Sequence, residues 1–152
     1  MKLNKREFLG FGAGAAAFAL VAGKTTLSFA AAEPTAEEAI KAFTGGAAVA
    51  EGKVSLSTPE IAENGNTVPV EVSVESAMTA DDYVAEVLIL ADGNPSPGVA
   101  TFKFTPMSGV AEASTRIRLS KTQNVIAVAK MSNGSFFMQK KSVKVTIGGC
   151  GG

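Results

Sequence analysis

Apolar and polar residues alternate with a period of two over most of the chain beyond residue 53, which is the pattern of β-strands with one buried face. The clearest example is the segment 67–75, where valine occupies every second position from Val68 to Val74. Pro69 within it lacks a backbone N–H, which favours an edge strand or the start of a strand. The same pattern predicts further strands at 53–57, 83–90, 99–105, 111–119 and 125–131, and a last strand that ends at Ile147.

Turn residues separate these segments at the spacing expected of an antiparallel β-sandwich. Dense turn signals lie at 63–66, 92–98 and 132–134. The sequence therefore predicts a mainly β protein, an immunoglobulin-like antiparallel β-sandwich of about seven strands. A small closed barrel is the alternative. The core of an antibody-type domain, with its tryptophan and cysteine pair, is excluded because the chain has no tryptophan and one cysteine.

A short helix is predicted before the strands. Thr35 and Glu38 have the spacing of a capping box, in which each side chain binds the backbone N–H of the other residue. Ile40 and Phe43 form an apolar stripe, and the paired glycines at 45–46 end the helix. Because a helix of about ten residues is marginal alone, its apolar side is expected to dock either on this domain or on a partner chain.

Residues 1–32 have the composition of an export signal peptide. Basic residues precede a weakly apolar run rich in alanine and glycine, and the small residues that follow fit a cut after Ala30 or after Ala32. The basic pair resembles a twin-arginine signal with Lys5 in the first position, which leaves the choice of translocase open. A transmembrane anchor is the alternative, but the run is short, whereas a span needs about 20 predominantly apolar residues.

Charge argues against a nucleic-acid partner. Of the 14 basic and 14 acidic residues, four basic residues and one acidic residue lie within 1–32, which leaves 10 and 13 for residues 33–152. A mildly acidic domain without a basic stripe is not expected to bind nucleic acid. Once the signal is removed, no association with a membrane is expected.

Two gaps in the composition exclude most enzyme classes. The chain has no histidine and a single cysteine. It therefore has no histidine-based acid–base pair, no intrachain disulfide and no cysteine-rich zinc or iron–sulfur site. No cofactor and no metal are expected. An independent thiol reductase or peroxidase fits poorly because there is neither a CxxC motif nor a histidine.

The last five residues of the chain hold its one reactive group. They are Gly148, Gly149, Cys150, Gly151 and Gly152. Glycine accepts nearly any backbone conformation, so this segment is predicted to be a flexible arm. Fully extended, it places Cys150 about 10 Å beyond Ile147. No acid or base lies within the arm, so activation of the thiol is expected to come from whichever protein binds it, which suits a carrier better than a catalyst. The alternative is a structural or adhesive exported β-sandwich with an incidental terminal thiol.

Three other features have ordinary structural interpretations. The acidic pair Asp81 and Asp82 precedes a strand and fits a turn better than catalysis. Arg116 and Arg118 share one face of a strand, where a solvated surface is favoured over a partner surface that binds anions. The segment 94–97 fits a rigid connection or a contact with another subunit.

Several segments together resemble one protein family. They are the C-terminal Val145-Thr146-Ile147-Gly148-Gly149-Cys150-Gly151-Gly152 and the internal Ile61-Ala62-Glu63-Asn64-Gly65, Val68-Pro69-Val70, Asn94-Pro95-Ser96-Pro97 and Thr115-Arg116-Ile117-Arg118-Leu119. In these segments, which span nearly the whole chain, and in its twin-arginine-like leader, the protein is similar to the SoxY family. Members of that family are the cysteine-bearing subunit of the SoxYZ carrier of the sulfur-oxidation (Sox) pathway.

The resemblance implies a periplasmic carrier rather than an enzyme. A c-type cytochrome would couple thiosulfate oxidatively to Cys150 and form a cysteine S-thiosulfonate. A hydrolase would then release sulfate, and a sulfane dehydrogenase would oxidise the remaining sulfur unless it passed to storage. The resemblance also implies a heterodimer with a SoxZ-like subunit. The segments are then 1–32 as export signal, 33–147 as helix and sandwich, and 148–152 as the cysteine arm.

Overall fold

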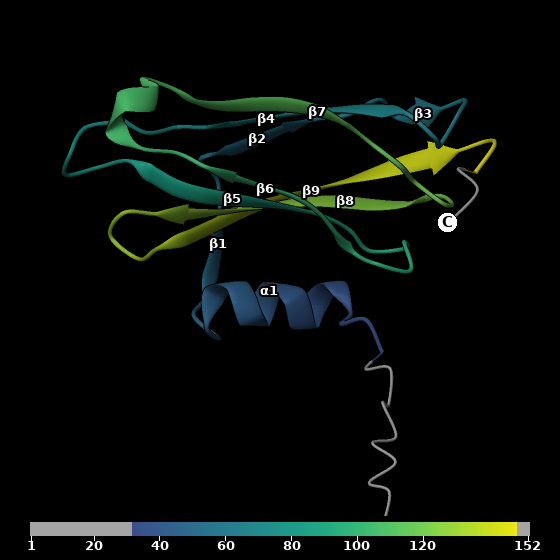
Figure 1. Cartoon of the computed structure of the whole chain (residues 1–152), viewed down its shortest axis with the longest axis horizontal. Helices are drawn as coiled ribbons and strands as arrows, with labels where there is room; N and C mark the ends of the chain where they lie inside the picture. The colour runs from purple at the N-terminus through teal and green to yellow at the C-terminus, as the bar shows by residue number, and fades with distance from the viewer. Residues whose placement is uncertain (1–31, 149–152) are drawn as a thin grey trace, which may run out of the picture. The chain divides into compact units, whose positions relative to one another are not determined.

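Two β-sheets lie face to face in the computed structural model, which describes residues 32–148, and one α-helix in that part of the chain crosses the outer side of the larger sheet (Figure 1). The elements are α1 (Ala36–Thr44), β1 (Val49–Glu51), β2 (Val54–Ser57), β3 (Ile61–Ala62), β4 (Val68–Val74), β5 (Val84–Ala91), β6 (Gly98–Lys103), a 3-10 turn (Pro106–Ser108), β7 (Ala111–Ile117), β8 (Gln123–Met131) and β9 (Phe136–Val145).

The topology confirms the predicted mainly β sandwich. The larger sheet has the strand order β1-β9-β8-β5-β6, with β3 also paired to β9, and the smaller sheet has the order β2-β4-β7. Residues 32–148 contain nine strands rather than about seven. The two extra strands are β1 and β3, which pair in parallel with the first and the last part of β9. With three and two residues, they are too short to show a period in the sequence.

Pro69 occupies a strand start, as expected, but not an edge strand. β4 is the middle strand of the smaller sheet. Its neighbour β2 pairs only with residues 71–74 and stops short of Pro69. Pro69 is the second residue of β4 and is paired on one side, with Arg116 of β7. The missing N–H is tolerated because the ladder to β2 does not extend to this position.

Side chains from the facing sides of the two sheets form the main core, and the largest buried ones include Leu56, Val70, Ile89, Val125 and Val143. Burial alternates strictly at the start of β4, whereas β8 is buried at nearly every position. A strand that is apolar throughout has both faces covered. The larger sheet therefore needs a second covering layer, which the smaller sheet does not.

The helix α1 supplies that layer. Its Ile40 and Phe43 pack with Leu90 and Ile126, which point away from the main core. The ring of Phe43 meets that of Phe136 in β9 edge to face, with 5.9 Å between centroids, an arrangement that aromatic pairs favour. Of the two predicted docking partners for the helix, the structure selects this domain.

The ends of α1 follow the sequence closely. The Thr35 hydroxyl accepts from the Glu38 backbone N–H at 3.3 Å, and the Glu38 carboxylate accepts from the Thr35 N–H at 2.8 Å. These bonds hold the pKa of Glu38 below its usual value of 4.5, with the bond from the Thr35 backbone as the main cause. Gly45 ends the helix in the left-handed region, at φ 64°, which glycine adopts without strain.

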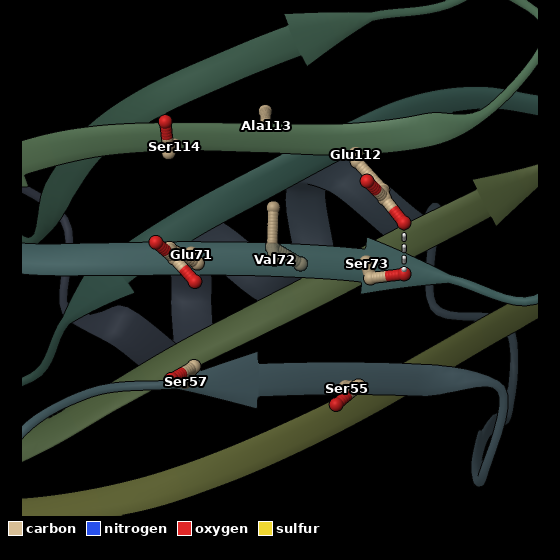
Figure 2. A pocket seen from close by; sticks show the side chains of 8 residues that line it. All are labelled: Ser55, Ser57, Glu71, Val72, Ser73, Glu112, Ala113 and Ser114. Atoms are coloured by element: carbon tan, nitrogen blue, oxygen red, sulfur yellow. Dashed lines mark hydrogen bonds between the residues drawn. The ribbon is translucent and has the colours of Figure 1, made fainter.

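No element of residues 32–148 covers the outer face of the smaller sheet. A shallow hollow there is lined by polar side chains of three adjacent strands (Figure 2), among them Ser55, Ser57, Glu71, Ser73, Glu112 and Ser114. Ser73 donates to Glu112 across strands β4 and β7 at 3.5 Å. Alternating strands with one solvated face account for this composition, so the hollow needs no functional explanation.

Candidate functional site

The cysteine arm leaves the sandwich at the end where β9 stops, on the right in Figure 1. Three connections reach that end: 63–67 between β3 and β4, 92–97 between β5 and β6, and 118–122 between β7 and β8. We call these connections and residues 146–148 the tail end. Of the predicted arm, Gly148 belongs to the described residues, while Gly149, Cys150, Gly151 and Gly152 lie outside them, as do the residues 1–31 of the predicted export signal.

Gly65 joins the last residues of the chain to the connection after β7. Its N–H donates to the carbonyl of Ile147 at 2.8 Å, and its carbonyl accepts from the N–H of Leu119 at 2.7 Å. Thr146 adds two bonds, from its N–H to Ala62 at 3.1 Å and from its hydroxyl to Glu63 at 3.0 Å. The backbone is thus held by neighbours for two residues beyond the end of β9.

Thr122 holds the end of β9 from the other side. Its hydroxyl accepts from the N–H of Val145 at 3.0 Å and donates to the carbonyl of the same residue at 3.4 Å. One side chain therefore bonds both backbone groups of Val145, three residues before the arm begins.

Asn94 organises the connection between β7 and β8. Its side-chain oxygen accepts from the N–H of Ser120 at 3.0 Å and from the side-chain amide of Gln123 at 2.8 Å. Its own amide donates to the carbonyl of Arg118 at 2.7 Å. Gln123 is 6% exposed, and its oxygen accepts from the N–H of Gly93 at 2.7 Å. The two carboxamides thus link the β5–β6 and β7–β8 connections through bonds to backbone groups.

Gly148 lies against the backbone of Ser120. A Cβ atom at this position would collide with the Ser120 carbonyl oxygen. The sequence assigned Gly148 to the arm because it is one of four glycines around Cys150, and nothing in the sequence distinguishes it from Gly149. Only the tertiary contact shows that Gly148 is needed for close approach to a neighbouring segment.

The remaining candidates are dispersed. Arg116 and Arg118 are both exposed. Arg118 belongs to the tail end, where its backbone carbonyl accepts from Asn94. Asp82 belongs to a turn at the opposite end, where its backbone exchanges bonds with Thr79 and accepts from Ser76. Within residues 32–148, no three potential ligands among aspartate, glutamate, histidine and cysteine come together as they would around a metal ion. No helix in the same part of the chain has the length and apolar character needed to cross a membrane.

Comparison with known proteins points to one family. The family model described as "Sulfur oxidation protein SoxY" matches residues 40–150, a range that ends at Cys150. A solved structure, that of the sulfur carrier protein SoxY from Chlorobium limicola f thiosulfatophilum, shares 34% sequence identity with the chain. The match has a TM-score of 0.62 and covers 73% of this chain and 96% of that one.

Other solved structures share only the fold. A superoxide reductase (neelaredoxin) from Ignicoccus hospitalis is 17% identical, with a TM-score of 0.56 over 62% of this chain and 80% of its own. A hypothetical protein from Pyrococcus horikoshii OT3 is 16% identical, with a TM-score of 0.54 over 63% and 96%. The search of curated proteins found no match.

Proposed function

The chain belongs to the SoxY family of sulfur oxidation proteins, and from this membership we propose that it is a carrier that holds sulfur intermediates covalently on Cys150. The observation that carries the proposal is the extent of the family match, which runs through the sandwich and reaches the one cysteine of the chain. The solved relative is itself described as a sulfur carrier protein. A sulfur-oxidation carrier is thus supported by both comparisons, and the attachment point is our inference.

Position and chemistry favour Cys150 as this point. It lies three residues beyond Ile147, in a segment made otherwise of glycine. The chain has no histidine to act as its base, so the thiolate has to be generated and used within a partner's site. A protein whose thiol reacts only when a partner engages it is a carrier and not a catalyst.

The proposed first step is oxidative. The thiolate sulfur of Cys150 bonds to the outer sulfur of thiosulfate and gives a cysteine S-thiosulfonate, while two electrons pass to a c-type cytochrome. In the second step a hydrolase directs water to the terminal sulfonate. Sulfate and two protons leave, and a persulfide remains on Cys150. A sulfane dehydrogenase then oxidises this sulfur with water to a sulfonate on Cys150, taking up six electrons and releasing six protons, or the sulfur atom passes to storage and leaves the free thiolate.

These steps define the partners and the location that we propose. The enzymes act in turn on one arm, so the carrier has to be in their compartment, the periplasm, which agrees with a signal peptide at 1–32. We also propose a heterodimer with a SoxZ-like subunit. Such a pair would be tested by co-expression and light scattering, and a monomer without affinity for that subunit would contradict it.

The intact mass of the protein after incubation with thiosulfate and an oxidising Sox cytochrome tests the carrier proposal. The expected result is a mass increase of one thiosulfonate group, localised by peptide mapping to Cys150. The hydrolase should then release sulfate and leave a mass increase of one sulfur atom. Protein alkylated beforehand at Cys150 is the control and should stay unloaded. An unchanged mass in the wild-type protein, or an adduct on another residue, would reject the proposal.

A further inference from the structure

We propose that Asn94 is the positioning residue of the cysteine arm: its carboxamide fixes residues 118–120, and these hold Gly148, so that the last held residue before Cys150 is Gly148 and not Ile147. This inference rests on the proposed function, because positioning matters only if Cys150 is presented to partners. Its evidence is a continuous set of contacts from Asn94 to Gly148.

The first part of this set holds Gly148 itself. Ile147 is bonded through its carbonyl to Gly65, and Gly65 is bonded in turn to Leu119. The residues that follow Ile147 and Leu119 are also in contact, since Gly148 lies against the carbonyl of Ser120. Residues 147 and 148 therefore lie beside residues 119 and 120. Gly65 links Ile147 to Leu119, and Gly148 contacts Ser120 directly.

The second part makes the β7–β8 connection a firm support. Asn94 binds the carbonyl of Arg118 and the N–H of Ser120, the residues on either side of Leu119. Leu119 is fully buried. Asn94 is itself held by Gln123, whose amide also donates to the carbonyl of Lys121 at 3.1 Å. A network with these bonds satisfied keeps its members in one geometry. Ser120 also donates from its hydroxyl to Gly93 at 3.2 Å.

The consequence is a shorter arm with a fixed origin. Cys150 is the second residue after Gly148, so the thiol-bearing Cα reaches at most about 7 Å from the fixed point, instead of about 10 Å from Ile147. A shorter arm with a fixed base has fewer positions to give up when it enters a partner's site, which lowers the entropic cost of binding. Gly148 then has a role of its own, because a residue with a Cβ atom would not permit this contact with Ser120.

The one cysteine of the chain allows a test that needs no sulfur chemistry. A nitroxide spin label on Cys150 reports the mobility of the arm through its EPR spectrum. In the purified chain, Asn94→Ala and Gly148→Ala should each narrow the spectrum, because the arm gains at least one free residue. The matched controls are Asn133→Ala, a loop asparagine at the opposite end whose side-chain oxygen accepts two bonds from Ser135, and Gly149→Ala. Neither should narrow the spectrum.

Amide hydrogen exchange gives a second readout at the fixed base. In Asn94→Ala the N–H groups of Gly65 and Leu119 should exchange about fivefold faster, the change expected from weakening one hydrogen bond each. Asn133→Ala should leave both rates unchanged. Wild-type spectra and exchange rates in Asn94→Ala, or equal narrowing in Asn94→Ala and Asn133→Ala, would overturn the inference.

Loading by the partner enzymes connects the positioning to function. Asn94→Ala should raise the KM for the loading enzyme several-fold more than it lowers kcat, because the thiol is intact but less well placed. Its reaction with iodoacetamide should match that of the wild type. If wild-type protein is never loaded with thiosulfate, the proposed function fails, while the EPR and exchange results still decide whether Asn94 fixes the arm. Equal KM values for wild type and Asn94→Ala would count against the inference alone.

Discussion

The two ends of the sandwich are built differently. At the tail end, Asn94, Gln123, Gly65 and Thr122 tie separate connections to one another and to the last residues of the chain. At the opposite end, on the left in Figure 1, many bonds stay within one turn, such as those of Asn133 with Ser135. One hydroxyl there, that of Ser132, joins two connections by accepting from Tyr83 and donating to Asp81. Both ends expose large apolar side chains: Met107 and Val110 at this end, at 96% and 60%, and Ile147 at the tail end, at 68%.

The two ends differ in which segments their hydrogen bonds join, and this decides how firmly each connection is placed. Hydrogen bonds within a turn preserve that turn's shape but do not place it relative to its neighbours. Bonds between connections fix several segments at once, which a group that has to be presented at one place requires. The proposed arm begins among connections that hydrogen bonds join to one another, which agrees with the proposed presentation of Cys150 to partner enzymes at this end.

The largest effect is expected for Cys150→Ser. All thiosulfate-dependent turnover in a reconstituted pathway should be lost, because the hydroxyl does not form the sulfur–sulfur bond. The free energy of unfolding should stay within about 0.5 kcal/mol of the wild-type value, as for surface changes generally. Sulfate release and thermal unfolding measure the two effects. Thiosulfate-dependent turnover by the Cys150→Ser protein would show that Cys150 is not the attachment point.

A smaller effect is expected for Gln123→Leu, which removes a buried carboxamide of the tail end. The N–H of Gly93 loses its partner and Asn94 loses one of its bonds, so the free energy of unfolding should fall by about 2 kcal/mol. The matched change at the opposite end is Ser132→Ala, whose hydroxyl accepts from Tyr83 at 3.1 Å and should cost about 1 kcal/mol. Urea unfolding of both variants gives the comparison. A larger loss in the free energy of unfolding for Ser132→Ala than for Gln123→Leu would contradict the contrast between the two ends.

The next effect concerns pH and the start of α1, which borders the tail end because Thr35 and Asp92 line one hollow. The pKa of Glu38 is lower in the folded protein than its usual value of 4.5. The charged carboxylate therefore stabilises the fold fully above about pH 4.5, and this contribution is lost as the pH falls through the lowered folded pKa. The stability difference between wild type and Glu38→Gln should accordingly shrink in acid.

Thermal unfolding from pH 7 down to pH 3 measures this difference. Glu37→Gln is the control, since it removes a carboxylate from the same turn but leaves the bonds between Thr35 and Glu38 in place. A stability difference for Glu38→Gln that grows as the pH falls would show that the capping bonds favour the protonated acid.

The smallest effect is expected for Met107→Ser at the opposite end. The side chain is almost fully exposed, so unfolding should change by no more than about 0.5 kcal/mol. The EPR spectrum of a spin label on Cys150 should also be unchanged. A loss of stability in urea unfolding would show that Met107 has packing in solution beyond what the isolated domain displays.

Much of the fold follows from local patterns in the sequence. The alternation at 68–74 gives β4, and the capping residues Thr35 and Glu38 give the start of α1. The near-continuous apolar run of β8 shows that both sides of its sheet are covered, although the pattern does not say by what. The short strands β1 and β3 could not be predicted, because their partners lie about 80 residues away along β9 and two or three residues show no period.

The residue types alone led to the chemistry that we propose for this protein. One cysteine among glycines, no histidine and a chain of alternating strands point to Cys150 as the carried thiol. Only the folded structure shows which segments meet: α1 covers this domain, Asn94 contacts Gln123, and Gly148 lies against Ser120. The physical reason is that residue types fix which bonds a group can form. Which groups come within reach depends on packing between segments far apart in the chain.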